Sequence, residues 1–250
     1  MNSSEGIEKT EIIWYNFRNG SAFLAYYILE CAVYTKKYLG RFINMKVLLV
    51  NGSPHEKGAT YAAMTVIAEA LATEGVESEI YWIGNEAVGG CMGCGYCRKA
   101  KKCVRDDSVN GISARLSEFD GFVFGSAVHY AASSGALSSF MDRLFFMNSF
   151  AMRMKPAAAV VSCRRGGATA AFDEINKYFT ISEMPIVSSN YWNQIHGSNY
   201  EEAMQDEEGV QTMKILGRNM AYLVKALAAA KDAGVEPHER ERKTLTNFIR

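Results

Sequence analysis

The sequence predicts an α/β protein in which a five-stranded parallel sheet carries helices on both faces. From Met45 onward, short apolar runs rich in β-branched residues alternate with longer segments of helical periodicity. Gly, Ser and Thr are frequent in the segments that follow the apolar runs. With 48% apolar and 22% charged residues, a chain of 250 residues can bury a large core. Strands that alternate with helices pair in parallel through right-handed crossovers, which gives a doubly wound sheet.

The expected strands are short segments bounded by turn residues, and most of them are apolar. The first, residues 46–50, is apolar throughout after Lys46, which is typical of a strand buried on both faces. The other expected strands are residues 77–83, 120–126, 155–162 and 184–188.

The expected helices lie between and after these strands and carry apolar residues at helical spacing. Asp106 and Asp107 are suited to cap one of them, because a carboxylate accepts hydrogen bonds from the N–H groups of a first turn. The pattern places helices at about residues 60–71, 107–118, 133–146, 172–179 and 209–231.

We expect the folded domain to cover residues 45–232, between two segments of different composition. The N-terminal segment 1–44 contains an apolar stretch at 21–34 that is too short for a membrane span and is interrupted by Glu30. It is a helical appendage, a membrane-surface segment, or translated sequence upstream of the true start. The C-terminal segment 233–250 is rich in charge, and we expect a solvated helix or an arm that contacts a partner.

Charge and composition exclude several classes of function. Basic and acidic residues number 27 each, so no surplus of positive charge exists to neutralise nucleic acid. The first residues lack the basic start and the cleavage site of a signal peptide, and we expect no membrane span. Clustered cysteines without a secretory leader are typical of a reducing compartment, so we expect a cytoplasmic protein.

The loop after the first strand has the features of a phosphate site. Residues 51–60 join the strand to a helix. The first N–H groups of a helix have no partner within the helix, and the helix dipole favours negative charge near them, so an anion can bind there. Ser53 and Thr60 would add hydroxyl donors. The loop matches neither the Walker A motif nor the dinucleotide fingerprint, and an ordinary strand–helix turn is the alternative.

Similar loops follow the other expected strands. In a doubly wound sheet, ligands bind outside the carboxyl ends of the strands, where the strand order reverses. We therefore expect four loops to form one ligand-binding rim, namely residues 52–60, 84–103, 125–134 and 162–169.

Four of the six cysteines lie in one glycine-rich stretch of the second loop, at positions 91, 94, 97 and 103. The spacing C-x2-C-x2-C, with a fourth cysteine further on, is typical of a run that binds a four-iron cluster. The CxxC pairs could instead bind zinc or cycle as a disulfide. Lysines and an arginine at residues 98–102 would offset the negative charge of bound thiolates or lower the pKa of a redox pair.

These loops together resemble the NADPH-dependent FMN reductase family of flavodoxin-like proteins, and within it the iron–sulfur flavoproteins. The resemblance covers residues 46–197. It rests on Gly52-Ser53-Pro54-His55 with Gly58 and Thr60, on residues 125–130 followed by Asp142-Arg143, on residues 162–169, and on the cysteine spacing. Two positions depart from the family pattern, since Ala127 replaces the usual proline and His129 the usual tyrosine.

The resemblance implies a flavodoxin-like fold that binds FMN and uses NAD(P)H to reduce a small acceptor such as a flavin or quinone. The expected FMN-binding residues are Ser53, His55, Thr60, Ser126, Ala127, Val128, His129, Tyr130, Ser162, Gly166 and Gly167. Gly166 and Gly167 would let the main chain approach the flavin closely. No residue is assigned as catalytic, because the cofactor itself carries the chemistry.

The resemblance also implies a [4Fe–4S] cluster on Cys91, Cys94, Cys97 and Cys103. The alternative function is therefore an iron–sulfur flavoprotein that carries electrons and exchanges them with ferredoxin. In either case the resemblance implies a homodimer or homotetramer.

Three further features of the sequence also carry expectations. The aromatic segment 191–197 would cover the flavin, form a lid or make a dimer contact. Asp142 and Arg143 are expected to end a helix as a structural ion pair, and Cys163 is expected to be a buried, inert thiol.

Overall fold

The structure is a computed structural model that describes residues 45–241 and 244–246. The chain divides into two compact units, Met1–Asn44 and Met45–Arg250. The predicted appendage at 1–44 lies outside the described residues. No helix in the described part of the chain is long and apolar enough to cross a membrane.

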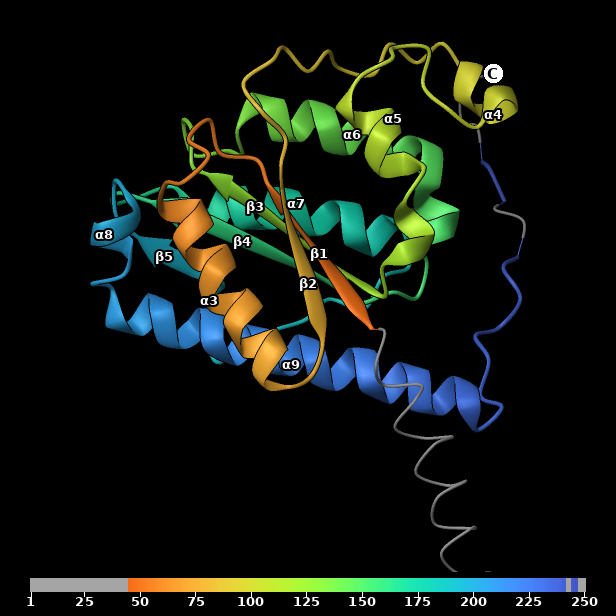
Figure 1. The fold of residues 1–250 in the computed structure, drawn as a ribbon. Coiled ribbons are helices and arrows are strands. Elements are labelled where there is room, and N and C mark those ends of the chain that lie inside the picture. Colours follow the sequence, from red (N-terminus) through yellow and green to blue (C-terminus); the bar gives the residue numbers. More distant parts are fainter. Residues whose placement is uncertain (1–44, 242–243, 247–250) are drawn as a thin grey trace, which may run out of the picture. The chain divides into compact units, whose positions relative to one another are not determined.

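The second unit is built on a five-stranded, fully parallel sheet, as predicted (Figure 1). Its strand order is β2-β1-β3-β4-β5, so the order reverses between β1 and β3. The strands are β1 (Lys46–Asn51), β2 (Glu77–Trp82), β3 (Gly121–Ala127), β4 (Ala157–Cys163) and β5 (Gln194–His196).

Helices cover both faces of this sheet. On one face, α3 and α9 lie side by side, and the other face is covered by α5, α6 and α7 (Figure 1). The helices are α3 (Ala59–Thr73), α4 (Tyr96–Ala100), α5 (Ser108–Ser113), the 3-10 turn η1 (Leu116–Glu118), α6 (Gly135–Met152), α7 (Ala168–Ile181), α8 (Tyr200–Ala203) and α9 (Glu207–Asp232).

The alternation of side chains along the strands creates one apolar layer on each face. Towards α5, α6 and α7, strand residues such as Leu48 and Phe124 join the helix residues Phe140 and Phe179, all fully buried. Every residue of β4 is buried, which is typical of a strand covered on both faces.

The prediction for the fifth strand is wrong in position. Residues 184–188 make only a single bridge, between Ile186 and Ala157, and the strand itself begins at Gln194. Between these two points the chain leaves the sheet, and buried Asn193 donates its side-chain N–H to Ala159 O at 3.0 Å. A side-chain amide therefore replaces the backbone donor that a continuous strand would have provided.

Two helix predictions also need correction. The segment expected to form one helix at 107–118 is divided into α5 and η1, although Asp107 caps α5 by accepting the N–H of Val109 at 3.1 Å. Asp142 and Arg143 lie inside α6, which continues to Met152, and they do not pair with each other. Asp142 accepts a hydrogen bond from the Tyr178 hydroxyl at 2.6 Å.

Candidate functional site

The loops after β1, β2 and β3 surround a cleft at the carboxyl edge of the sheet. This edge is next to the point where the strand order reverses, which is the ligand-binding position of doubly wound sheets. The cleft has a volume of about 210 Å³. It is lined by Gly52, Ser53, Pro54, Gly84, Asn85, Glu86, His129, Ser134, Gly135 and Ala136.

A buried asparagine at the end of β1 shapes the first of these loops. The Asn51 side chain accepts the N–H of Ser53 at 3.0 Å and donates to Glu56 O at 3.0 Å. Ser53 Oγ in turn accepts the N–H of His55 at 3.1 Å. Trp82, at the end of β2, donates its indole N–H to Ser53 O at 2.8 Å. The loop is therefore fixed by side chains from two adjacent strands before any ligand binds.

The loop leads into the uncapped N-terminus of α3. Gly58 occupies the N-cap position, and no side chain caps the helix. The N–H groups of Ala59, Thr60 and Tyr61 have no acceptor among the described residues. Three free donors at the positive end of a 15-residue helix suit an anion such as a phosphate.

The hydroxyl of Thr60 has a different environment from the one expected. Thr60 is fully buried, and its Oγ1 lies 2.8 Å from Ser162 Oγ of β4. The pair joins α3 to the end of β4 beneath the loop. Of the two hydroxyls predicted for the phosphate, Ser53 lines the cleft, whereas Thr60 binds Ser162, a residue that was expected beside the flavin.

Ser134, which was not among the predicted site residues, connects the first loop to the third. Its hydroxyl donates to Gly52 O at 2.6 Å and accepts the N–H of Leu137 as the N-cap of α6. Its own N–H donates to the hydroxyl of Ser126 at 2.8 Å. A serine and a glycine directly before an apolar helical pattern is a recognisable N-cap signal, so this residue could have been found.

The remaining residues predicted on the third loop form a tight turn above the cleft. His129 and Ala132 exchange two backbone hydrogen bonds of 2.9 Å, and the intervening Tyr130 and Ala131 have φ of 48° and 60°. Neither residue is glycine, so the turn holds backbone strain. His129 and Tyr130 are exposed, and His129 lines the cleft, while the preceding Ala127 and Val128 are partly buried. His55, on the first loop, is exposed as well.

The two glycines of the fourth loop have different surroundings. Gly167 has φ +89°, and a Cβ there would lie 2.9 Å from the Cα of Ala131. The close backbone approach at Gly167 is thus made by the third loop. Gly166 is exposed, and a Cβ there would meet nothing within 4 Å.

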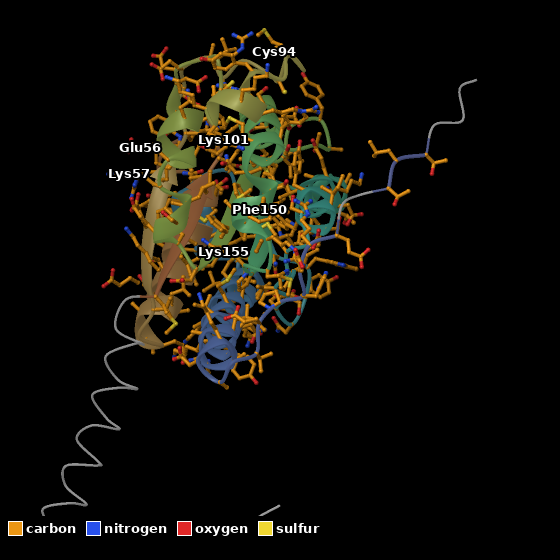
Figure 2. All side chains as sticks on the ribbon, turned by 90° about the vertical axis from the view of Figure 1, so that its right-hand side faces the viewer. Glu56, Lys57, Cys94, Lys101, Phe150 and Lys155 are labelled. Carbon is orange, nitrogen blue, oxygen red and sulfur yellow. The ribbon has the colours of Figure 1, made fainter. Side chains whose placement is uncertain are left out.

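All four predicted cysteine ligands line one hollow. We call residues 83–107, between β2 and α5, the cysteine loop. Cys91 and Cys94 are exposed and Cys97 and Cys103 partly buried, all as free thiols. Their hollow is closed on one side by side chains of α6. Figure 2 shows Cys94 at the outer end of the molecule, away from Glu56 and Lys57 of the first loop.

Arg143 anchors the cysteine loop from within α6. Its side chain is 1% exposed and pairs with both carboxylate oxygens of Asp107, at 2.5 and 2.8 Å. Its Nε–H donates to Cys103 Sγ at 3.3 Å. Burial alone would lower the pKa of Arg143, but the hydrogen bonds that its guanidinium donates to Asp107 and Cys103 outweigh this effect, so the pKa is raised. The predicted ion pair with Asp142 is therefore replaced by a pair with Asp107.

A single metal ion and a four-iron cluster require different arrangements of the four thiols. Among the described residues, no group of three or more His, Cys, Asp or Glu side chains converges enough to hold one metal ion. A tetrahedral zinc site needs sulfur atoms only ~3.8 Å apart, given a Zn–S bond of about 2.3 Å. A four-iron cluster attaches each thiolate to a different iron, so its ligands stand further apart around one hollow.

The cleft and the hollow are both lined by α6. Ala136 of α6 lines the cleft and Arg143 of the same helix lines the hollow, which separates them by two turns, or about 10 Å along the helix. The cysteine loop contributes to both, through Glu86 at the cleft and Gly90 at the hollow.

The aromatic segment and Cys163 lie outside this arrangement. Tyr191 and Trp192 pack edge to face, 4.7 Å between ring centroids, and each is half exposed beside the β4 edge just before β5. Burial raises the pKa of the Cys163 thiol, which is consistent with an inert side chain.

The sheet order, the cleft at its reversal point and the uncapped α3 define a flavodoxin-like α/β protein. The solved structure of a flavodoxin from the domain Archaea has the same fold, with a TM-score of 0.51 and 20% identity over 72% of this chain and 99% of that chain. The model of the NADPH-dependent FMN reductase family matches residues 45–198, and the chain belongs to this family of FMN-dependent oxidoreductases.

Among curated proteins, two relatives cover most of the described unit. An iron–sulfur flavoprotein of Methanocaldococcus jannaschii is 31% identical over 191 residues, or 73% of this chain and 99% of the relative. An iron–sulfur flavoprotein of Methanosarcina thermophila is 26% identical over 192 residues, or 75% of this chain and all of the relative.

Proposed function

We propose that this protein is an iron–sulfur flavoprotein, an FMN-dependent oxidoreductase that also binds a [4Fe–4S] cluster on Cys91, Cys94, Cys97 and Cys103. The supporting observation is that the four thiols line one hollow two helical turns from the cleft. The names of the two relatives support the same assignment. FMN supplies hydride and electron transfer when bound, and the cluster supplies one-electron transfer.

The protein's own residues would bind and orient the flavin. The free N–H groups at the start of α3 and the Ser53 hydroxyl would bind the FMN phosphate. The turn at 129–132 would lie against the ring, with His129 at the cleft. Because a Cβ at Gly166 would meet nothing within 4 Å, the flavin could approach the main chain closely there.

The proposed electron partner is a small acidic redox protein such as a ferredoxin. Arg98, Lys99, Lys101 and Lys102 are exposed next to the cysteines and form a positive surface there. Such a surface favours encounter with a negatively charged partner.

NAD(P)H-dependent reduction of a small acceptor such as a flavin or quinone is the second candidate, and the family description favours it. We propose that the protein acts in the cytoplasm, which its clustered cysteines favour, and forms the homodimer or homotetramer that its family resemblance implies.

Metal and flavin analysis of anaerobically purified protein tests the proposal. We expect one FMN and about four irons per chain, with a broad visible absorbance that bleaches on reduction. Cys94→Ser should remove iron and leave FMN bound, whereas Cys163→Ser, the matched control outside the hollow, should leave both. Flavin without iron, together with steady NADPH oxidation, would instead support the second candidate.

FMN and riboflavin titrations of the flavin-free protein test the phosphate site separately. Because the proposed contacts are made to the phosphate, FMN should bind far more tightly than riboflavin. Equal affinities would show that the α3 N-terminus does not bind the phosphate.

A further inference from the structure

Cys103 differs from the other three cysteines in how it is held. Asn110 of α5 accepts the Cys103 N–H at 2.8 Å and donates to the Cys103 carbonyl at 3.1 Å. Arg143 donates to the Cys103 sulfur at 3.3 Å. In the described part of the chain, no hydrogen bond reaches the sulfur atoms of Cys91, Cys94 or Cys97. One ligand of the four is therefore fixed at both its backbone and its sulfur.

All hydrogen bonds of the Arg143 guanidinium are donated to the cysteine loop. Besides Asp107 and Cys103, it donates to Gly89 O at 3.2 Å and to Arg105 O at 3.1 Å. These acceptors lie at both ends of the stretch that carries the cysteines. A buried guanidinium with bidentate pairing is a rigid anchor, because breaking it would leave a desolvated charge unpaired.

We propose that Arg143 is a positioning residue for the cysteine loop and that its N–H bond to the Cys103 sulfur raises the reduction potential of the group bound there. The inference rests on the proposed cluster. Hydrogen bonds to ligand sulfur and nearby positive charge both stabilise the more negative, reduced state of an iron–sulfur centre. Asp107 opposes this effect, since its carboxylate neutralises part of the guanidinium charge.

Redox titration of the anaerobically purified full-length protein, followed by cluster absorbance and electron paramagnetic resonance, tests the electronic part. Arg143→Lys retains the charge but loses the forked geometry. Loss of the N–H···S bond should make reduction about tenfold less favourable, or about 59 mV for one electron. Arg143→Met should shift the potential further in the same direction. Asp107→Asn keeps an N-cap for α5 and should shift it the opposite way.

Asp142→Asn is the matched control, because Asp142 is next to Arg143 on α6 but binds Tyr178. Its potential should equal that of the unmodified protein. Wild-type potentials in Arg143→Lys, Arg143→Met and Asp107→Asn, at full iron content, would overturn the proposal.

Hydrogen exchange of residues 103–110 tests the positioning part without reliance on the cluster. The Cys103 N–H is hydrogen-bonded, so freeing the loop should speed exchange of this segment about tenfold in Arg143→Lys, given a charged hydrogen bond of about 1.5 kcal/mol. Unchanged exchange would refute the anchor. Absence of iron from the unmodified protein would refute the proposed cluster and, with it, the effect on potential. Loss of iron from the Arg143 variants alone, with FMN and helical content retained, would support positioning.

Discussion

At the scale of single residues, the Thr60–Ser162 contact indicates that the Thr60 hydroxyl has a structural role, in contrast to the Ser53 hydroxyl proposed to bind the phosphate. Thr60→Val keeps the side-chain volume but leaves the nearly buried Ser162 hydroxyl without this partner. We expect the free energy of unfolding to fall by about 1 to 2 kcal/mol in urea denaturation. FMN affinity should change less than about threefold, because the proposed phosphate contact of Thr60 is its N–H, which valine retains.

Thr65→Val is the matched control within the same helix, since Thr65 donates only to the carbonyl of Ala62. Its effect on unfolding should stay below about 0.5 kcal/mol. If Thr60→Val instead lost FMN affinity tenfold with its stability intact, the Thr60 hydroxyl would be a phosphate ligand.

The sequence allows the loops to be recognised but not the residues that hold them in place. The loop from Gly52 to Thr60 and the spacing of the four cysteines are local patterns, so both can be recognised from the sequence alone. Arg143 acts through contacts with residues 36 to 54 positions away, which no local pattern encodes. The Asn51 side chain binds residues only two and five positions away, but its burial depends on the folded sheet. The sequence does contain one indication that Arg143 is buried. It lies three residues after Phe140, at the margin of the apolar face of α6.

At the scale of secondary-structure elements, Gly167 and Gly166 form a natural pair for comparison. Gly167→Ala places a Cβ at positive φ and 2.9 Å from Ala131, so the β4–α7 loop must move away from the β3–α6 turn. We expect a loss of about 2 to 4 kcal/mol in unfolding free energy. FMN binding should weaken, because both loops belong to the proposed site.

Gly166→Ala has open space around its Cβ and should cost less than about 0.5 kcal/mol. Urea denaturation and FMN titration of both variants provide the comparison. Equal stability of the two would contradict the close packing of the two loops.

The strands were predicted correctly where their residues are consistently apolar. β1, β3 and β4 are apolar and almost entirely buried, whereas β2 is only partly buried and begins with polar residues. The fifth was misplaced because Gln194–His196 is short and mainly polar, whereas residues 184–188 are apolar. Burial of Met184 and Val187, with a single bridge to the sheet, explains that apolar pattern without a strand.

At the scale of the whole molecule, acid stability depends in part on a carboxylate at the β2 edge. Two 2.8 Å hydrogen bonds from Arg115, against the effect of burial and with help from Lys46, lower the pKa of Glu79 from 4.5 to about 2. A lowered carboxyl pKa stabilises the fold above the unfolded-state value. This contribution is lost as the pH falls from about 4.5 to about 2.

Glu79→Gln should therefore destabilise the protein by about 1 to 2 kcal/mol at pH 7 and by almost nothing at pH 2. The value at pH 7 is smaller than the full pKa shift would give, because the side chain of Glu79 is partly exposed to solvent. Denaturation across this pH range measures the difference. Glu118→Gln removes a more exposed carboxylate from the same Arg115 and should have the smaller effect at pH 7. An effect of Glu79→Gln that does not depend on pH would exclude the charge as its cause.

The interruption before β5 has a consequence for the behaviour of the protein at high concentration. A long, regular outer strand offers unpaired N–H and C=O groups to which a strand of another molecule can add. Here the outermost strand has three residues, and the chain before it turns out of the sheet between residues 188 and 193. Among the described residues, no uninterrupted ladder is available on that side, so this border of the sheet resists intermolecular β-pairing, whereas β2 forms a regular six-residue strand at the opposite border.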